Sequence, residues 1–413
     1  MNFPMIRLTP LGKIIYQHLG QIVIMLLLYA IVMLLSATQS LPVVTIVHQL
    51  PSTILSIWAN RILNLILLTG FITGSLMMSI DQILDVRWVI RLYRAWTALI
   101  IVSLMLSGFD INPMLDIATA IVLFGYLALN LFNRQPTPFL NVWIIGIMLV
   151  ISSLLAQWIV TDSWQIIVYL FQIQIAYMVT GISIMFWLIT RWSNVRLEWA
   201  RDGVMIVGGC VSVAGFFITI APLHHSPFIS MLSVLIVPIC YMILAGHSYR
   251  ALKDRNQNQS LSPHWIAIAV LLWLAGAGFL GTLSTHFGFQ QWLQGTRLAD
   301  SQYGLMMWGA LGIVLSLINY TATELRGENR RVTGYMPLWL IAFGVGFGTI
   351  ILGCAGVVEI YLSKFLLMDN VTVDALLIPL TMVWIICLLM VALGFMIYAL
   401  GFWVRRPIIH IDS

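Results

Sequence analysis

Long uninterrupted apolar runs dominate the sequence, and they decide what the chain can fold into. Twelve runs are long enough to cross the hydrocarbon core of a bilayer as helices, which takes about 20 residues each. They lie at 16–37, 53–80, 92–109, 115–132, 139–161, 164–190, 203–223, 227–249, 264–286, 302–321, 335–362 and 373–404. We therefore predict an all-α polytopic membrane protein in which residues 1–413 form a single twelve-helix transmembrane domain.

Composition excludes the main alternative, an ordinary water-soluble protein. Hydrophobic residues make up 61% of the chain and charged residues only 8%. A soluble globular domain carries about 25% charged residues. The loops between the runs are short and leave no room for a soluble catalytic domain. Any chemistry or transport must therefore take place among the helices or at their ends, where polar groups are costly.

The basic residues predict how the chain is oriented. With the N-terminus in the cytoplasm, only Arg61, Arg297 and Lys364 of the 20 Lys and Arg residues fall outside the cytoplasmic loops and tails. Membrane proteins concentrate Lys and Arg on the cytoplasmic side. We therefore expect both termini in the cytoplasm and the protein in the cytoplasmic (inner) membrane, with the first run kept as a helix and not cleaved as a signal peptide. The net charge of +5 reports this topology and no nucleic-acid partner.

The four cysteines give no indication of a disulfide or an iron–sulfur site. Cys210, Cys240, Cys354 and Cys387 all lie within apolar runs, and no C-x-x-C motif occurs. Buried free cysteines behave as small hydrophobic residues. We expect that role for all four.

One histidine pair is a candidate metal site. His224 and His225 are adjacent and lie between the seventh and eighth runs, within the segment 221–227. Neighbouring imidazoles can bind one metal ion, although two ligands are too few for a tight site. A solvated turn is the alternative interpretation. For the other six histidines we predict interfacial or hydrogen-bonded positions.

Several polar residues lie at membrane depth. Gln172 and Gln174 in the sixth run are two positions apart and so do not share a helix face, and we expect each to hydrogen-bond a neighbouring helix. Arg61 and Glu359 lie near the outer ends of the second and eleventh runs, and we expect both to extend toward the outer interface. Whether these two residues pair with each other is left open.

Two segments contain distinctive residues at fixed spacings, and we treat each as a sequence motif. The first reads Gly295-Thr296, five residues, Gln302-Tyr303-Gly304, three residues, Trp308-Gly309-Ala310. The second reads Arg61-Ile62-Leu63-Asn64-Leu65-Ile66.

With these two motifs, the twelve apolar runs and the His224-His225 pair, the chain resembles the large subunit of the heme–copper oxidase superfamily. The resemblance is closest to the nitric oxide reductase branch and its C-family oxidase relatives. That family's tenth span looks like G-T-x(5)-H-x-H-x(3)-W-G-A, its second span carries R-x-L-H-T-N, and two adjacent histidines of its seventh span bind a non-heme metal. The resemblance implies a bundle like that of the family's large subunit.

The residues that would bind heme in that family are replaced here. Gln302 and Gly304 stand at the two heme-ligand positions of the tenth span, and Asn64 stands at the heme ligand of the second. The metal histidine of the sixth span falls near Tyr169, and that span contains no histidine. A low-spin heme needs two strong axial ligands, which Asn and Gly do not supply. We therefore expect no heme, and at most a single non-heme metal ion at His224 and His225.

Loss of the hemes would leave a volume that other side chains must fill, because membrane interiors are closely packed. Large residues near the former ligand positions are candidates for this filling, and ordinary interhelical or lipid-facing positions are the alternative. The candidates are Tyr169, Phe171, Tyr303, Met306 and Met307.

The leading functional hypothesis is a heme-less, non-catalytic structural or partner subunit of a respiratory electron-transport complex. Its partners would be the lipid bilayer and other membrane subunits. Two alternatives stay open. One is an active oxidoreductase that reduces oxygen or nitric oxide with reassigned ligands, His224, His225 and His286. The other is a transporter whose path uses the vacated cofactor space and is lined by Asn64, Gln172 and Gln302, so whether the chain is an enzyme is left open.

Overall fold

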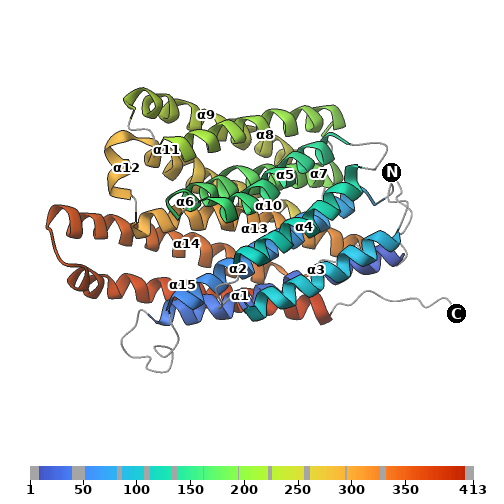
Figure 1. Ribbon diagram of the computed structural model, residues 1–413, viewed down its shortest axis with the longest axis horizontal. Coiled ribbons are helices and arrows are strands. Elements are labelled where there is room, and N and C mark those ends of the chain that lie inside the picture. The colour runs from blue at the N-terminus through green and yellow to red at the C-terminus, as the bar shows by residue number, and fades with distance from the viewer. Residues whose placement is uncertain are drawn as a thin grey trace.

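The apolar runs form helices because a helix satisfies every backbone hydrogen bond within itself, as a bilayer interior requires. The computed structural model describes residues 9–39, 52–80, 86–106, 112–131, 137–160, 162–193, 195–221, 226–254, 261–293, 295–325 and 332–404. Within these ranges, twelve helices are long and apolar enough to cross a membrane (Figure 1). The predicted all-α polytopic fold is confirmed.

Nine of the described spans are single helices, and the bounds of the first eight are as follows. They are α1 (Pro10–Thr38), α2 (Ser52–Met78), α3 (Val86–Leu106), α4 (Asn112–Leu131), α5 (Pro138–Ile159), α8 (Leu197–Ile220), α9 (Pro227–Lys253) and α13 (Arg297–Leu325). The last span, α15 (Asn370–Val404), is also a single helix.

Three spans contain a π-helical segment, which the sequence did not predict. The sixth span runs through α6 (Asp162–Phe171), η2 (Gln172–Tyr177) and α7 (Met178–Trp192). The ninth runs through α10 (Ser262–Trp273), η3 (Leu274–Leu280) and α11 (Gly281–Thr285), and the eleventh through α14 (Tyr335–Ile360) and η4 (Tyr361–Phe365). A short helix, α12 (Phe287–Leu293), follows the ninth span.

Four spans begin at least five residues earlier than predicted, because helices continue into polar flanks that no apolar run marks. The first starts at Pro10 and not at residue 16, and the third at Val86 and not at residue 92. The seventh starts at Leu197 and not at residue 203, and the tenth at Arg297 and not at residue 302. In the first turns of α3, the Arg91 guanidinium lies 5.1 Å from the centre of the Trp88 ring. Such cation–π contacts suit the interface between lipid and water, where an amphipathic helix end is stable.

Three helices occupy the centre of the bundle. In α2, the sixth span and α13, between 89% and 94% of the most apolar window is buried, whereas in every other described span the share is 56% or less. These three helices also contact one another. They are spans two, six and ten, so every fourth span of the chain is central.

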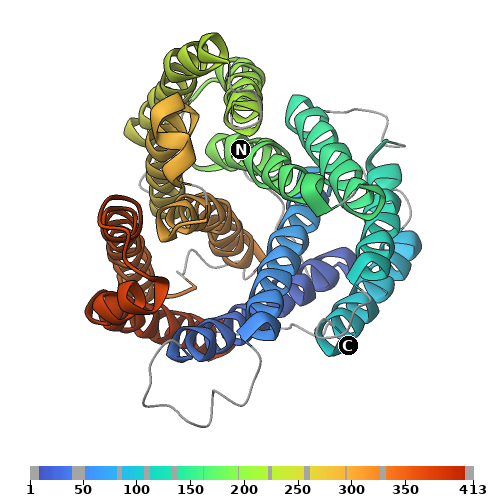
Figure 2. The same cartoon turned by 60° about the vertical axis from the view of Figure 1, so that its left-hand side comes forward.

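The other described spans form three arcs of three helices, and each arc begins and ends at a central helix. α3, α4 and α5 lead from α2 to the sixth span, and α8, α9 and the ninth span lead from the sixth span to α13. α14, α15 and α1 lead from α13 back to α2, because the last helix packs against the first. Figure 2 shows the helices gathered in these arcs.

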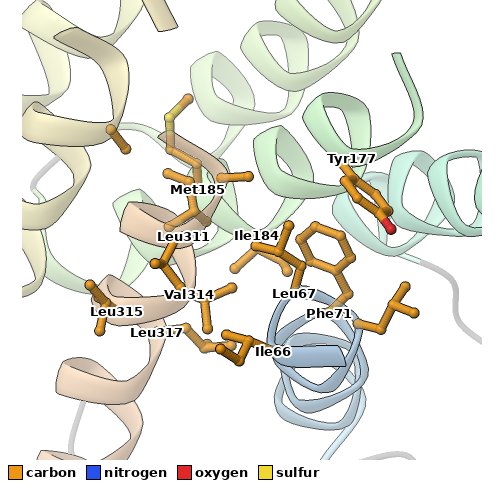
Figure 3. Close-up of a cluster of buried hydrophobic side chains, with 14 of the residues drawn as sticks. Ile66, Leu67, Phe71, Tyr177, Ile184, Met185, Leu311, Val314, Leu315 and Leu317 are labelled. Carbon is orange, nitrogen blue, oxygen red and sulfur yellow. The ribbon is translucent and has the colours of Figure 1, made fainter. Parts of the chain in front are cut away.

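The three central helices meet in a closely packed apolar core (Figure 3). Leu67 and Phe71 of α2 face Ile184 of α7, and Phe71 lies edge-on to Tyr177 at a ring separation of 5.7 Å. Gly70 allows α2 to approach α13, because a Cβ atom there would lie only 2.5 Å from Val314 Cγ2. Close backbone approach at small residues is a common means of association between membrane helices.

We expect Gly70→Ala to destabilise the protein by about 1–3 kcal/mol, the usual cost of overpacking a core. Val314 is fully buried, and three of its side-chain atoms lie within 3.1 Å of a Cβ atom at Gly70, so the substitution forces Val314 or a helix to shift. The measurement is the free energy of unfolding from a denaturant titration in mixed micelles.

Gly20→Ala is the matched control, since nothing lies within 4 Å of a Cβ atom at that position in α1. Alanine is a better helix former than glycine, so this substitution should be neutral or stabilise by about 0.5–1 kcal/mol. Equal effects of the two substitutions would contradict the close approach of α2 and α13.

Candidate functional site

The predicted metal pair lies outside the part of the chain that the structure describes. His224 and His225 fall between α8 and α9, so their role stays a prediction. Among the described residues, no group of three or more His, Cys, Asp or Glu side chains is placed to hold a metal ion. His286, the third ligand of the oxidoreductase alternative, is exposed, and its Nδ1 accepts a hydrogen bond from the Gly288 backbone N–H at 3.2 Å.

The positions that the sequence resemblance assigns to missing heme and metal ligands all lie on the three central spans. Asn64 is on α2, Tyr169 is on α6, and Gln302 and Gly304 are on α13. Gln302 is 97% buried, and its side-chain nitrogen lies 3.7 Å from where a Cβ atom of Gly281 would be. Gln302 therefore faces the ninth span, while Asn64 has other neighbours.

A chain of hydrogen-bonded polar side chains, buried at Gln172 and Tyr177 and half-buried at its two ends, links α5, the sixth span and α2. Gln157 Nε2 donates to Gln172 Oε1 at 2.8 Å, and Gln172 Nε2 donates to the Tyr177 hydroxyl at 2.6 Å. That hydroxyl donates in turn to Asn64 Oδ1 at 3.2 Å. The structure thus joins two residues of the transporter alternative, Asn64 and Gln172, through a tyrosine that the sequence analysis did not select.

The π-helical segment explains why Gln172 and Tyr177 can meet. In an α-helix, residues five apart point in widely different directions, since each residue turns by 100°. A π-helix is wider, and its backbone hydrogen bonds join residues five apart. Two residues at that spacing therefore lie closer to the same face than they do in an α-helix. Gln172 and Tyr177 are the first and last residues of η2.

Gln174 belongs to a different contact. Its Oε1 accepts a hydrogen bond from Thr219 Oγ1 of α8 at 2.9 Å. The prediction that Gln172 and Gln174 lie on different faces and hydrogen-bond neighbouring helices is confirmed.

Arg61 forms a buried ion pair with Asp116 of α4. Its Nη1 donates to Asp116 Oδ1, and the two side chains are only 11% and 15% exposed. The prediction that Arg61 extends to the interface is wrong, because a carboxylate on a neighbouring helix pairs with it inside the protein. Glu359 accepts instead from the Arg297 backbone N–H at 2.9 Å, so Arg61 and Glu359 do not pair.

One face of α2 at this ion pair carries donors without acceptors. The Nε and Nη2 atoms of Arg61 are buried and have no hydrogen-bond partner among the described residues. The same holds for the indole N–H of Trp58, one turn earlier on the helix. Residues three apart in a helix share a face, so the unpaired donors of Trp58 and Arg61 lie together. Among the described residues, Asp116 is the carboxylate that pairs with Arg61.

A second buried polar cluster joins α1, α3 and α4. The fully buried His18 has its Nδ1 3.2 Å from Gln21 Oε1 and its Nε2 3.3 Å from the Tyr126 hydroxyl. An amide oxygen only accepts, so Nδ1 carries the hydrogen and Tyr126 donates to Nε2. Gln21 Nε2 then donates to Thr97 Oγ1 at 2.8 Å. The prediction of a hydrogen-bonded histidine is confirmed.

Large side chains fill the space between the sixth span, the ninth span and α13. Trp273 is fully buried against Gly181 and Gly309, and its indole N–H donates to the Met306 carbonyl oxygen at 3.0 Å. The Tyr241 hydroxyl donates to Met178 Sδ at 3.3 Å.

Another group of aromatic rings fills the space between α1, α13 and α15. The Trp308 ring stacks on Phe395 at 6.1 Å, with 12° between the ring planes, and lies 5.8 Å from Tyr29. Of the residues proposed as filling from the sequence, Met306 and Met307 are buried, while Tyr169, Phe171 and Tyr303 are half-buried.

Comparison with models of known protein families and with curated proteins finds no match for this chain. The resemblance to the heme–copper oxidase large subunit therefore stays a prediction from the sequence motifs and the number of predicted spans.

We expect Asp116→Leu to cost about 3–5 kcal/mol of unfolding free energy, because it leaves the Arg61 charge buried without a partner. The double variant Arg61→Met with Asp116→Leu removes both charges and should be closer to the wild type than Asp116→Leu alone. Denaturant titration of all three proteins in the same mixed micelles measures the difference. A double variant at least as unstable as Asp116→Leu would show that the ion pair does not govern stability there.

Proposed function

We propose that this protein is a cofactor-free relative of the heme–copper oxidase large subunit that serves as a structural or partner subunit of a respiratory electron-transport complex. It would lie in the cytoplasmic membrane with both termini in the cytoplasm and bind other membrane subunits of that complex. The proposal rests on the sequence motifs around Asn64 and Gln302, whose family counterparts carry the heme histidines.

One structural observation supports this proposal most. The spans whose heme-ligand histidines are replaced, the second and the tenth, are two of the three central helices of the bundle, and the third is the sixth span. A cofactor held between helices needs ligands on central spans, because only there do side chains point into protein on all sides. The motif residues around Asn64 and Gln302 therefore lie on central helices, where replacing a cofactor ligand also changes how the helices pack.

The side chains now at these places supply contacts in place of ligands. Asn64 accepts a hydrogen bond from Tyr177, and Gln302 packs beside the ninth span. Trp273 occupies the space between Gly181 and Gly309, with its indole N–H hydrogen-bonded. Packed aromatic rings and paired amides stabilise a bundle, whereas heme ligation needs imidazole or a comparable strong ligand.

The test is the visible absorption spectrum and pyridine-hemochrome assay of the purified chain. We expect no stoichiometric heme after the chain has been separated from any partner subunit, and we expect it to co-purify with membrane subunits under mild detergent. Stoichiometric heme in the separated chain would overturn the proposal. Elemental analysis of wild type beside His224→Ala with His225→Ala distinguishes the oxidoreductase alternative, which requires iron or copper that this double variant loses.

A transporter is the second candidate, and the hydrogen-bonded chain Gln157–Gln172–Tyr177–Asn64 favours it. Intramembrane polar groups in a continuous series often line pathways for ions or polar solutes. In proteoliposomes, a transporter of this kind should lose most of its flux when Asn64, Gln172 and Gln302 are replaced by alanine. Gln174→Ala is the matched control, because Gln174 hydrogen-bonds Thr219 outside the chain. Unchanged flux in the triple variant would exclude this candidate.

A further inference from the structure

A cavity of about 100 Å³ lies where the first residue of α13 meets α14 and α15. Its walls are mostly apolar and come from the two long C-terminal helices, with Ile351 and Leu352 on α14 and Leu380 and Trp384 on α15. These four side chains are half-exposed on the surface of the bundle. Arg297 supplies the positive charge of the lining.

Arg297 is only partly satisfied by its protein partners. Its Nη2 donates to Asp374 Oδ1 at 2.9 Å, and its backbone N–H donates to Glu359 Oε2 at 2.9 Å. Its Nη1 is buried and has no hydrogen-bond partner among the described residues. A buried guanidinium nitrogen without an acceptor is costly, so this nitrogen favours a bound oxygen.

Negative charge surrounds the same arginine. Asp374 and Glu359 contact it directly, and Asp300 is close enough to interact electrostatically with both Arg297 and Glu359. The side chain of Asp374 is 68% exposed, and it pairs with Arg297 through one of its two oxygens. Three carboxylates beside one guanidinium disfavour a ligand with a net negative charge and favour one that also carries a positive group.

The charged residues lie near the ends of their helices, apart from the apolar residues of the cavity. Arg297 begins α13, Glu359 lies in the last turn of α14, and Asp374 lies in the second turn of α15. Charged groups at helix ends belong to the headgroup region of a bilayer. The apolar walls of the cavity come before Glu359 on α14 and after Asp374 on α15, which is toward the membrane interior on both helices. The site is therefore polar at one end and apolar at the other.

We propose that this cavity binds one phospholipid of the ethanolamine class. A phosphate oxygen accepts a hydrogen bond from Arg297 Nη1, and the primary ammonium pairs with the carboxylate of Asp374. Part of one acyl chain fills the cavity against Leu352 and Trp384. The anionic phosphatidylglycerol headgroup lacks the ammonium and meets the three carboxylates, and a choline headgroup has no N–H with which to donate.

Native mass spectrometry of the purified full-length chain tests this binding. The protein is incubated with an equimolar mixture of phosphatidylethanolamine, phosphatidylcholine and phosphatidylglycerol that share the same acyl chains. We expect one phosphatidylethanolamine per chain to survive gas-phase activation that removes the other lipids. Arg297→Gln should reduce its retention about tenfold, the effect of losing one hydrogen bond to a charged group.

Thr381→Trp is a second, independent variant, because Thr381 lines the cavity and a larger side chain there excludes the acyl chain without changing any charge. It should reduce retention to a similar degree. Lys364→Gln is the matched control, since Lys364 is an exposed cation of η4 outside the cavity lining, and its retention should equal that of the wild type. Asp374→Asn should remove the preference for ethanolamine over choline.

Two outcomes would overturn the proposal. One is equal retention of phosphatidylethanolamine by the wild type and by both Arg297→Gln and Thr381→Trp. The other is preferential retention of phosphatidylglycerol, which would mean that positive charge alone attracts the lipid. The result is independent of whether the chain binds heme.

Discussion

The bundle depends on the close packing of three helices that contact protein on all sides. Apolar side chains gain little by leaving lipid for protein, since acyl chains are as apolar as leucine, so membrane helices associate through tight packing and hydrogen bonds. α2 packs tightly on α13 at Gly70, which admits Val314, and on the sixth span Tyr177 lies against Phe71 and donates a hydrogen bond to Asn64. Each arc of outer helices then packs on two of these three central helices.

Polar groups inside the bundle follow from the same constraint. A polar side chain that does not bond a carbonyl of its own helix is stabilised by a partner on another helix, because the bilayer supplies none. Arg61 is paired with Asp116, and Tyr177 connects Gln172 with Asn64. Apolar contacts tolerate small shifts of one helix along another. A hydrogen-bonded pair instead fixes how far one helix is shifted along the other and which faces of the two helices meet. These few contacts therefore set the register of α2 against α4 and the sixth span.

The number and approximate limits of the spans could be predicted from the sequence, because length and apolarity alone define a span. The facing of Gln172 and Gln174 could also be predicted, since a spacing of two separates them on any helix. Which helices are central could not. A lipid-facing residue is as apolar as a buried one, and Met105, 70% exposed, and Met306, 1% exposed, are the same residue type in similar runs.

The residue pairs of the candidate site also could not be predicted from the sequence. Asp116 is 55 residues from Arg61, and no local pattern relates the two. Trp273 fits its place only because Gly181 and Gly309, on two other spans, leave room for the indole ring. The π-helical turn that brings Gln172 toward Tyr177 depends on packing from neighbouring spans. Such features arise from tertiary contacts, which a single sequence does not display.

The arrangement in arcs also bears on how the chain assembles during synthesis. Two of the arcs are built from consecutive spans, so each is complete as soon as its closing central helix has entered the membrane. The third is different, because it joins α14 and α15 to α1, the first helix made. The face of α1 that packs on α15 must therefore wait in lipid through the synthesis of the intervening spans, and the ring of helices closes only when the last one arrives.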